Sequence, residues 1–327
     1  MQTFITVISS KIVILLDLHS MRVDLQQAIA QLKNGEVVAI PTETVYGLAA
    51  DATNDGALRQ IYAIKQRPMD NPLIVHIGSS AQVSDWAAEF SPLAQILANA
   101  FWPGPFTLVL PAKPHVSLIV RANQPTVALR VPAHPLTLQL LKESGLALAA
   151  PSANKFTQLS PTMAAHVTAG LGDNISVLDG GACKVGIEST IVAVQGDHWQ
   201  LLRLGMISEV EIERVAGKAP SLFSQPIKAP GQHHLHYSPR TRVRLFSSRD
   251  ALITSANVHC AALLIGEGAQ PACQVFQLNK NAADVAQQLY DTLHKMDALD
   301  VSELLVEAPP NAPEWLAILD RLTRAAS

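Results

Sequence analysis

Two short polar segments mark the positions at which this sequence could do chemistry. They are KQR at 65–67 and PSAN at 151–154. Two cations combined with small hydroxyl and amide groups can bind phosphate, because N–H and O–H donors pair with phosphate oxygens. The sequence contains neither a Walker-type glycine loop nor a Gly-x-Gly-x-x-Gly segment after an expected strand. A bound nucleotide would therefore depend on side chains, and the two segments indicate a phosphate-handling site.

The first segment follows a helix that the spacing of Leu58 and Ile61 predicts. Lys65 and Arg67 then lie near the C-terminal end of that helix, where cations also complement the helix dipole without any ligand. The turn that follows contains two prolines, which stiffen it and hold Asn71 in a fixed orientation. A rigid polar turn at this point favours a binding role for Asn71.

The second segment follows an apolar strand expected at 146–150. Ser152 and Asn154 are common turn residues, but ligands of open α/β sheets bind just beyond the carboxyl ends of strands. Other polar residues also border expected strands, and their number at strand ends favours a shared site. They are Thr126, Arg130, Ser160, Ser189 and Arg203.

Three other features carry weaker signals. His76 lies on an apolar strand, where a histidine is more often a core residue than a ligand. The group His233, His234 and His236 could bind a metal, but no pattern of carboxylates accompanies it. Cys183 precedes Lys184, which could activate the thiol, yet no histidine is adjacent to support a nucleophile.

The elements that must position these residues alternate between strands and helices. A helix is expected over Leu25–Leu32, with Gly35 after it, and another begins at Ser91-Pro92. Alternation with fully apolar strands predicts an α/β sheet covered by helices. The remaining strands are expected at 37–40, 73–77, 106–110, 127–131, 146–150, 176–178, 190–194 and 200–204, and helices at 135–144 and 161–169.

The pattern changes near residue 220, where prolines and glycines interrupt all periodicity. Strands at 243–246, 261–265, 275–278 and 304–307 then alternate with helices at 282–296 and from Pro313, which predicts a small doubly wound unit. The sequence is thus divided into an N-terminal extension (1–20), a catalytic domain (21–219), a linker (220–240) and a C-terminal α/β domain (241–327).

Composition narrows the classes of protein. Of the 327 residues 48% are hydrophobic and 5% aromatic, and the net charge of −3 provides no general basic field for nucleic acid or anionic membranes. Three scattered cysteines argue against a disulfide framework and favour a reducing cytoplasm.

The apolar stretch before Asp17 is not typical of a signal peptide, because Lys11 interrupts it and no cleavage site follows. It is also too short to span a membrane. Residues 1–20 are expected to form an extra strand, or to precede a true start at Met21.

Six motifs in order resemble the YrdC-type threonylcarbamoyl-AMP synthases. They are PTETVYGL (41–48), Lys65-x-Arg67, NPL (71–73), WPGPFT (102–107), APSAN (150–154) and GIEST (186–190). The segment from Pro230 to Pro239, followed by a small α/β unit, is similar to the two-domain members. The resemblance implies a YrdC-like twisted sheet with flanking helices and a small Rossmann-like C-terminal domain.

The resemblance also implies a reaction, in which L-threonine, bicarbonate and ATP give threonylcarbamoyl-AMP and pyrophosphate. A partner transferase would pass the threonylcarbamoyl group to the adenosine beside the anticodon of tRNA. Mg²⁺ would accompany ATP, held mainly by its phosphates rather than by protein ligands. A weak contact with RNA or tRNA is left open, and no general base can be named.

By the same resemblance, the nucleotide and the amino acid are bound by different residues. The expected catalytic residues are Lys65, Arg67, Ser152 and Asn154. Those expected to bind ATP are Arg67, Asn71, Thr126, Ser152, Ser160, Arg203 and Tyr237, with Tyr237 on a linker that covers the site. Those expected to bind L-threonine are Thr44, His76, Arg130, Ala150 through its backbone, and Ser189.

Three other interpretations fit the sequence less well. An RNA-binding or ribosome-maturation protein could use a basic pocket, but the charge and few aromatics oppose it. A hydrogenase-maturation carbamoyl transferase contains a related domain, but its zinc modules need paired cysteines. A relative that has lost its activity is opposed by the intact Lys65-x-Arg67 and Ser152-x-Asn154.

Overall fold

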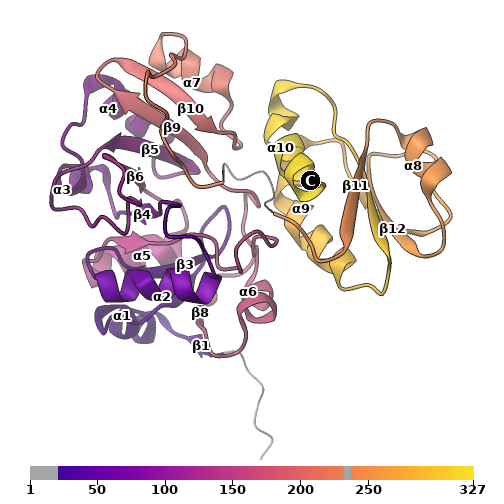
Figure 1. Ribbon diagram of the computed structural model, residues 1–327, viewed down its shortest axis with the longest axis horizontal. Coiled ribbons are helices and arrows are strands. Elements are labelled where there is room, and N and C mark those ends of the chain that lie inside the picture. The colour runs from indigo at the N-terminus through magenta and orange to yellow at the C-terminus, as the bar shows by residue number, and fades with distance from the viewer. Residues whose placement is uncertain (1–20, 232–236) are drawn as a thin grey trace, which may run out of the picture.

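The structure is a computed structural model that describes residues 21–231 and 237–327. The expectations for residues 1–20 and for His233, His234 and His236 lie outside the described residues. Two units, each built on its own sheet, make up the described chain (Figure 1).

The first unit is built on a ten-stranded mixed sheet in the order β1-β8-β2-β3-β7-β4-β6-β5-β9-β10. Strands β4 and β6 are parallel, whereas β7 pairs antiparallel with both β3 and β4. The strands are β1 (Arg22–Val23), β2 (Val38–Ile40), β3 (Gly47–Asp51), β4 (Ile74–His76), β5 (Phe106–Pro111), β6 (Thr126–Arg130), β7 (Leu148–Ala149), β8 (Ser176–Leu178), β9 (Thr190–Gln195) and β10 (His198–Arg203).

Helix ends in this unit follow ordinary capping chemistry. Ser91 accepts the N–H of Ala94 at the start of one helix, and Gln66 ends another in a left-handed conformation with φ of 53°. The helices are α1 (Leu25–Lys33), α2 (Asp55–Lys65), the 3₁₀ turn η1 (Ser80–Gln82), α3 (Val83–Trp86), α4 (Pro92–Phe101), α5 (Pro135–Ser144), α6 (Ala164–Leu171) and α7 (Glu209–Ala216).

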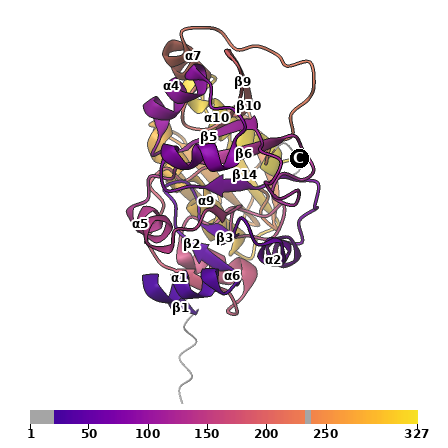
Figure 2. The ribbon, with the colours of Figure 1, turned by 90° about the vertical axis from the view of Figure 1, so that its left-hand side faces the viewer.

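Both faces of the central strands are buried. On β9, Val192 and Val194 join the large core that includes α2 and α4, whereas Ile191 and Ala193 point to the other face. That second face is covered by residues of the segment after α7, among them Phe223, Ile227 and Ala229. Figure 2 shows this segment leaving α7 and running down the side of the first unit.

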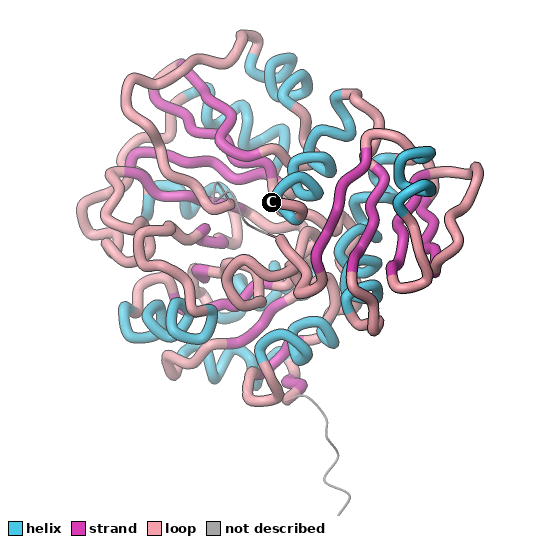
Figure 3. The backbone as a smooth tube through the Cα atoms, turned by 45° about the vertical axis from the view of Figure 1, so that its right-hand side comes forward, coloured by secondary structure: helices cyan, strands magenta, loops and turns pink. Residues whose placement is uncertain are grey.

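The second unit has a parallel four-stranded sheet in the order β11-β14-β12-β13 (Figure 3). One face packs on α8, while the other packs on α9 and α10, which lie against the first unit (Figure 1). Its elements are β11 (Arg242–Phe246), α8 (Arg249–Ser255), β12 (Cys260–Ile265), β13 (Gln274–Leu278), α9 (Ala282–Asp297), β14 (Glu303–Glu307), the 3₁₀ turn η2 (Pro313–Trp315) and α10 (Leu316–Ala325).

The two units share an apolar contact. Val45, Leu159 and Ile187 of the first unit belong to the same buried cluster as α9 and α10. At Gly186, with φ of +84°, an added Cβ would lie 2.3 Å from the backbone oxygen of Ala286 in α9. Only a residue without a side chain permits this approach.

The predicted α/β fold with a small parallel C-terminal unit is confirmed. Within residues 21–231 and 237–327, the expected strands and helices all occur, with ends shifted by a few residues. Sequence patterns missed β1, β3, α3, α7 and α8. No helix in the described part of the chain is long and apolar enough to cross a membrane.

Candidate active site

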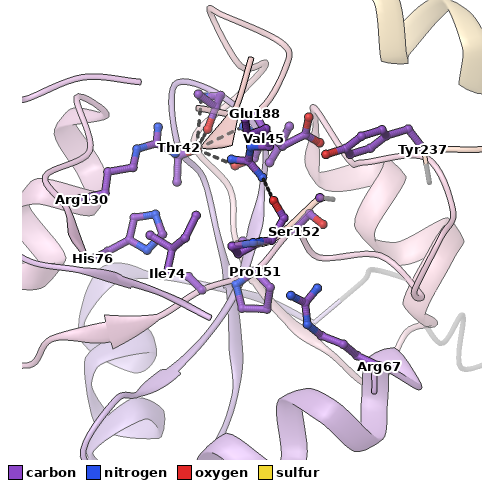
Figure 4. A pocket seen from close by; sticks show the side chains of 16 residues that line it. Thr42, Val45, Arg67, Ile74, His76, Arg130, Pro151, Ser152, Glu188 and Tyr237 are labelled. Carbon is purple, nitrogen blue, oxygen red and sulfur yellow. Dashed lines mark hydrogen bonds between the residues drawn. The ribbon is translucent and has the colours of Figure 1, made fainter. Parts of the chain in front are cut away.

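A hollow opens where the carboxyl end of β4 meets the segment after β7. Figure 4 shows His76 and Arg130 on one side of it and Arg67 and Tyr237 on the other. Its lining residues are Thr42, Thr44, Val45, Gly47, Arg67, Ile74, His76, Arg130, Ala150, Pro151, Ser152, Glu188, Arg203, Pro230, Gly231 and Tyr237.

A compact hydroxyl turn forms one part of the wall. Thr42 Oγ1 donates to the carbonyl oxygen of Val45 at 2.6 Å and accepts the backbone N–H groups of Thr44 and Val45. The Oγ1 atoms of Thr42 and Thr44 are 2.8 Å apart. This network fixes the Thr44 hydroxyl at the wall of the cavity.

Arg130, at the end of β6, is held by a buried carboxylate. Its Nη2 lies 2.6 Å from Glu43 Oε1, and its Nε donates to the carbonyl oxygen of Gly104. Glu43 Oε2 accepts the N–H of Ala133. Burial raises the pKa of Glu43, but the charge and hydrogen bond of Arg130 lower it more, so Glu43 is ionised at neutral pH. Both side chains are therefore fixed in a charged pair.

His76 is buried at the end of β4 and lines the cavity. Burial, helped by the nearby charge of Arg130, lowers its pKa to about 3. The imidazole is therefore neutral at pH 7. Within the described residues its Nδ1 has no hydrogen-bond partner, so the ring can still accept or donate one bond.

Arg67 follows the C-terminus of α2 and packs along the rigid turn after it. Its Nη2 donates to the carbonyl oxygen of Pro72 at 2.9 Å, and its Nε donates to that of Asn71. Burial lowers its pKa to about 10, which leaves it charged at neutral pH. The turn thus holds a cation at the wall of the cavity, whereas the sequence predicted that its two prolines would position Asn71, which does not line this cavity.

Lys65 supports the segment after β7 from behind the cavity. Its Nζ donates to the carbonyl oxygens of Ser152 and Asn154, the latter at 2.6 Å. Burial, together with the charge of Arg67, lowers the pKa of Lys65 well below its ordinary value. Asn154 Nδ2 donates to the carbonyl oxygen of Gln158. Ser152 reaches the cavity, whereas Lys65 and Asn154 hold its turn in shape.

Arg203, at the end of β10, joins two strands and the linker. Its Nε and Nη2 donate to the carbonyl oxygen and the Oγ of Ser189, both at 3.0 Å. Its Nη1 donates to Pro230 in the linker, and the Ser189 Oγ also lies 2.8 Å from Thr107 Oγ1. Burial lowers the pKa of Arg203. The hydroxyl and carbonyl oxygens of Ser189 thus accept hydrogen bonds from Arg203 behind the cavity wall.

Glu188 is the one carboxylate on the cavity wall within the described residues. Ser160 Oγ donates to its Oε1 at 2.6 Å, and Tyr290 and Arg321 of the second unit donate to its Oε2. Burial raises its pKa, but the charges of Arg321 and Arg203 and the hydrogen bonds from Ser160 and Arg321 lower it to about 2. Glu188 is therefore ionised at neutral pH.

Tyr237 reaches the cavity from the end of the linker. Its φ of 62° places it in the left-handed region, and its side chain is buried. An added Cβ at Gly231 would lie 2.6 Å from its hydroxyl oxygen. The glycine therefore makes room for the Tyr237 hydroxyl at the wall of the cavity.

The cavity gathers eight of the residues that the sequence singled out: Thr44, Arg67, His76, Arg130, Ala150, Ser152, Arg203 and Tyr237. Lys65, Asn154, Ser160 and Ser189 contact its wall from behind. Asn71 lines a neighbouring hollow with Phe156 and Lys228. Thr126 begins β6 and pairs with Pro111, outside the lining. Whether each contacts a ligand stays a prediction.

Sequence reasoning missed three residues that organise the cavity: Glu43, Glu188 and Arg321. Glu43 and Glu188 each stand within a run that is otherwise apolar or hydroxylic, where a carboxylate needs a partner once buried. Arg321 shares the buried face of α10 with Ile318 and Leu322. A cation on the apolar face of an amphipathic helix is buried and needs a counter-charge, so the sequence of α10 already indicated an ion pair.

We expect the stability contributed by Glu188 to disappear in acid. Its folded-state pKa of about 2 lies below the ordinary 4.5. It therefore stabilises the fold above about pH 4.5, by about 3 kcal/mol, and loses this as pH falls through about 2. Urea unfolding of the wild type and Glu188→Gln should show a gap in unfolding free energy that narrows between pH 5 and pH 2.5. A gap that stays constant over this range would contradict the assignment.

The arrangement suits an anionic ligand. Three guanidinium groups, from Arg67, Arg130 and Arg203, converge on one cavity with backbone and hydroxyl groups between them. The described residues contain no group of three or more histidine, cysteine or acidic side chains placed to hold a metal ion. The chemistry that this geometry favours is the binding and alignment of phosphate and carboxylate groups.

Two family models together match nearly the whole chain. Residues 30–205 match a family described as "Telomere recombination", whose model is named for Sua5, YciO and YrdC. Residues 207–327 match the "Threonylcarbamoyl-AMP synthase, C-terminal domain".

Similar proteins of known name cover both units. The chain is 40% identical to threonylcarbamoyl-AMP synthase of Bacillus subtilis, over 92% of each chain. It is 37% identical to the enzyme of Pyrococcus abyssi, over 90% of this chain and 92% of that one. A crystal structure of P. abyssi Sua5 complexed with L-threonine superposes with a TM-score of 0.84 at 34% identity, covering 94% of this chain and 96% of that one.

Proposed function

Because the chain belongs to the two-domain threonylcarbamoyl-AMP synthase family, we propose that it joins L-threonine, bicarbonate and ATP into threonylcarbamoyl-AMP. The protein is an enzyme of the nucleotidyltransferase class. The observation that carries the proposal is the meeting of Arg67, Arg130 and Arg203 at one buried cavity. Such a site can bind an amino-acid carboxylate and a triphosphate side by side.

The threonine side of the reaction is assigned to the wall formed by Thr44, His76 and Arg130. Arg130 would pair with the threonine carboxylate, since the hydrogen bonds of the described residues leave its Nη1 N–H groups available. Neutral His76 and the Thr44 hydroxyl would orient the rest of the amino acid. P. abyssi Sua5, which shares this fold, has been crystallised with L-threonine, and this supports the assignment.

The nucleotide side is assigned to the wall formed by Arg67, Ser152, Arg203 and Tyr237. The threonine amine and bicarbonate would form a carbamate with loss of water. A carbamate oxygen would then bond to the α-phosphorus as the bond to pyrophosphate breaks. This displacement needs alignment and neutralised charge, which the fixed guanidinium groups of Arg67 and Arg203 supply. Enclosure would protect the carbamate and the mixed anhydride from water.

We propose that Mg²⁺ enters with ATP. Mg²⁺ prefers oxygen ligands and commonly binds through substrate phosphates and one or two protein groups. The cavity offers hydroxyl oxygens of Thr44 and Ser152, while the Glu188 carboxylate already accepts bonds from three side chains. These groups fit an ion held mainly by the phosphates, whose charge it would neutralise.

The wider setting follows from the same proposal. The product would be passed to a threonylcarbamoyl transferase for modification of the adenosine next to the tRNA anticodon, in the cytoplasm. We also propose that the chain is divided into a catalytic domain (21–219), a linker (220–240) and a C-terminal domain (241–327).

Pyrophosphate release tests the proposed reaction. With ATP and Mg²⁺, release should require both L-threonine and bicarbonate and should collapse in Ser152→Ala. Ser302→Ala is the matched control, because its hydroxyl donates to His259 in the second unit. Release with threonine alone in carbon-dioxide-free buffer would indicate amino-acid adenylation instead. No release from folded protein that binds ATP would reject the synthase function.

We also expect measurable use of L-serine at high concentration. Serine lacks one methyl group of threonine, and one methyl in an apolar pocket is worth only about 1–3 kcal/mol. The ratio of kcat/KM for threonine to that for serine should therefore lie between about 10 and 200. Mass spectrometry of the AMP-linked product, with each amino acid alone, measures this ratio. Undetectable serine product at saturating serine would contradict the prediction.

A further inference from the structure

The second unit contacts the cavity wall at Glu188, a carboxylate that belongs to the first unit. Glu188 lines the cavity, yet two of the three side chains that donate to it, Tyr290 and Arg321, come from α9 and α10. The segment that carries Glu188 also touches α9 at Gly186, where the backbones approach too closely for any side chain. The wall at Glu188, labelled in Figure 4, is therefore built jointly by both units.

Arg321 is the centre of this contact. Its side chain is only 1% exposed, and its Nε lies 2.8 Å from Glu188 Oε2. Its Nη2 donates to the carbonyl oxygen of Leu204 and its Nη1 pairs with Asp320. Its guanidinium carbon lies 4.9 Å from the centre of the Tyr237 ring. One cation from α10 thus contacts both a carboxylate and an aromatic ring of the cavity wall.

The charges explain why this contact matters. A triphosphate in the cavity would be attracted by Arg67 and Arg203 but repelled by ionised Glu188, because all three line the same space. Burial makes this repulsion stronger than it would be in water. Arg321 places an opposite charge directly on the Glu188 carboxylate, while its Nη1 pairs with Asp320, and so weakens the repulsion between Glu188 and the phosphates.

We propose that Arg321 is a positioning residue through which the C-terminal unit sets the affinity of the cavity for nucleotide, by neutralising Glu188. The proposal rests on the assignment of ATP to this cavity. It gives the C-terminal unit a definite role, because the first unit carries the carboxylate on the cavity wall and the second unit supplies the cation that is directly paired with it. Tyr237 is held against the same guanidinium.

The test measures binding of ATP with Mg²⁺ to the full-length protein by calorimetry, without threonine or bicarbonate. Arg321→Met should raise the Kd for ATP about tenfold, a size typical of coupling between sites. Arg321→Lys, which keeps the charge, should change it by less than about threefold. Glu188→Gln removes the repulsive charge and should bind ATP at least as tightly as the wild type.

The double variant Glu188→Gln/Arg321→Met separates neutralisation from simple damage. Because both charges are removed, it should bind ATP more tightly than Arg321→Met alone. Arg249→Met is the matched control, since Arg249 pairs with Glu307 inside the second unit at 2.7 Å and does not line the cavity. It should leave the Kd unchanged. Thermal unfolding of each variant identifies any loss of fold.

Several results would overturn the proposal. They are a folded Arg321→Met with wild-type Kd, a double variant no better than Arg321→Met, and a Glu188→Gln that binds ATP more weakly than the wild type. If Arg321→Met does not fold, the proposal is tested by the Kd for ATP of the other two single variants. A Glu188→Gln that binds more weakly than the wild type, or an Arg321→Lys changed by more than about threefold, would then overturn it. Failure of the synthase reaction is seen separately, as absent pyrophosphate release from wild-type protein that binds ATP.

Discussion

Replacing Arg130 with methionine is expected to raise the KM for L-threonine about 100-fold and to destabilise the fold by about 3–5 kcal/mol. The first effect follows from the loss of the charged partner proposed for the threonine carboxylate. The second follows from Glu43, whose Oε1 would lose the guanidinium that lies 2.6 Å away. A buried carboxylate without its cation is costly, because among the described residues only backbone N–H groups, those of Ala133 and of Glu43 itself, would still donate to it.

The two effects can be separated with a second substitution. Glu43→Gln/Arg130→Met removes the buried charge and should recover most of the lost unfolding free energy. It should not recover threonine binding, because the cation is still missing. Urea unfolding measures the first quantity and pyrophosphate release at varied threonine the second. If the double variant regains the wild-type KM, Arg130 serves only to pair with Glu43.

Local sequence patterns predicted most elements of the fold because each has its own periodicity or capping signal. Strand β8 was predicted at its observed bounds, and the Ser91-Pro92 start of α4 was confirmed. Strand β3 was missed because GLAAD contains no β-branched or aromatic residue. Helices α7 and α8 were missed because each buries only one hydrophobic residue, Ile212 and Leu252 respectively.

The candidate site was predictable where charged or polar residues lie beside the end of a recognisable strand or helix. Arg67, Ser152 and Arg203 stand beside recognisable elements, and the cavity collects them. The pairing of Glu188 with Arg321 spans 133 residues and two units. No local pattern selects such a partner, because the sheet order and the docking of α10 decide it. Sequence therefore indicated the residues facing the cavity better than those that hold them.

The substitution Lys65→Met tests the same distinction, between residues that face the cavity and residues that position them. Lys65 matches a family motif that suggests phosphate contact, but its Nζ is engaged by the carbonyl oxygens of Ser152 and Asn154. Without this donor, the turn loses the group that fixes Ser152 at the cavity wall. We expect kcat to fall about 100-fold, because a misplacement of about 1 Å in a positioning group costs this much. Lys155→Met, which removes an exposed lysine from the same turn, is the control and should be near wild type.

The balance between kcat and affinity reveals which role Lys65 has. If it positions the turn, the Kd for ATP with Mg²⁺ should rise far less than kcat falls, since Arg67 and Arg203 keep their charges and contacts. If its ammonium group instead leaves the carbonyls and binds phosphate, the Kd should rise at least as much as kcat falls. The unfolding free energy should drop in either case, by about 1–3 kcal/mol for each buried carbonyl left without a donor. Single-turnover pyrophosphate release, measured together with calorimetric binding of ATP, distinguishes the two roles. Because Lys65 is buried, we expect the result of the first role, in which it positions the turn.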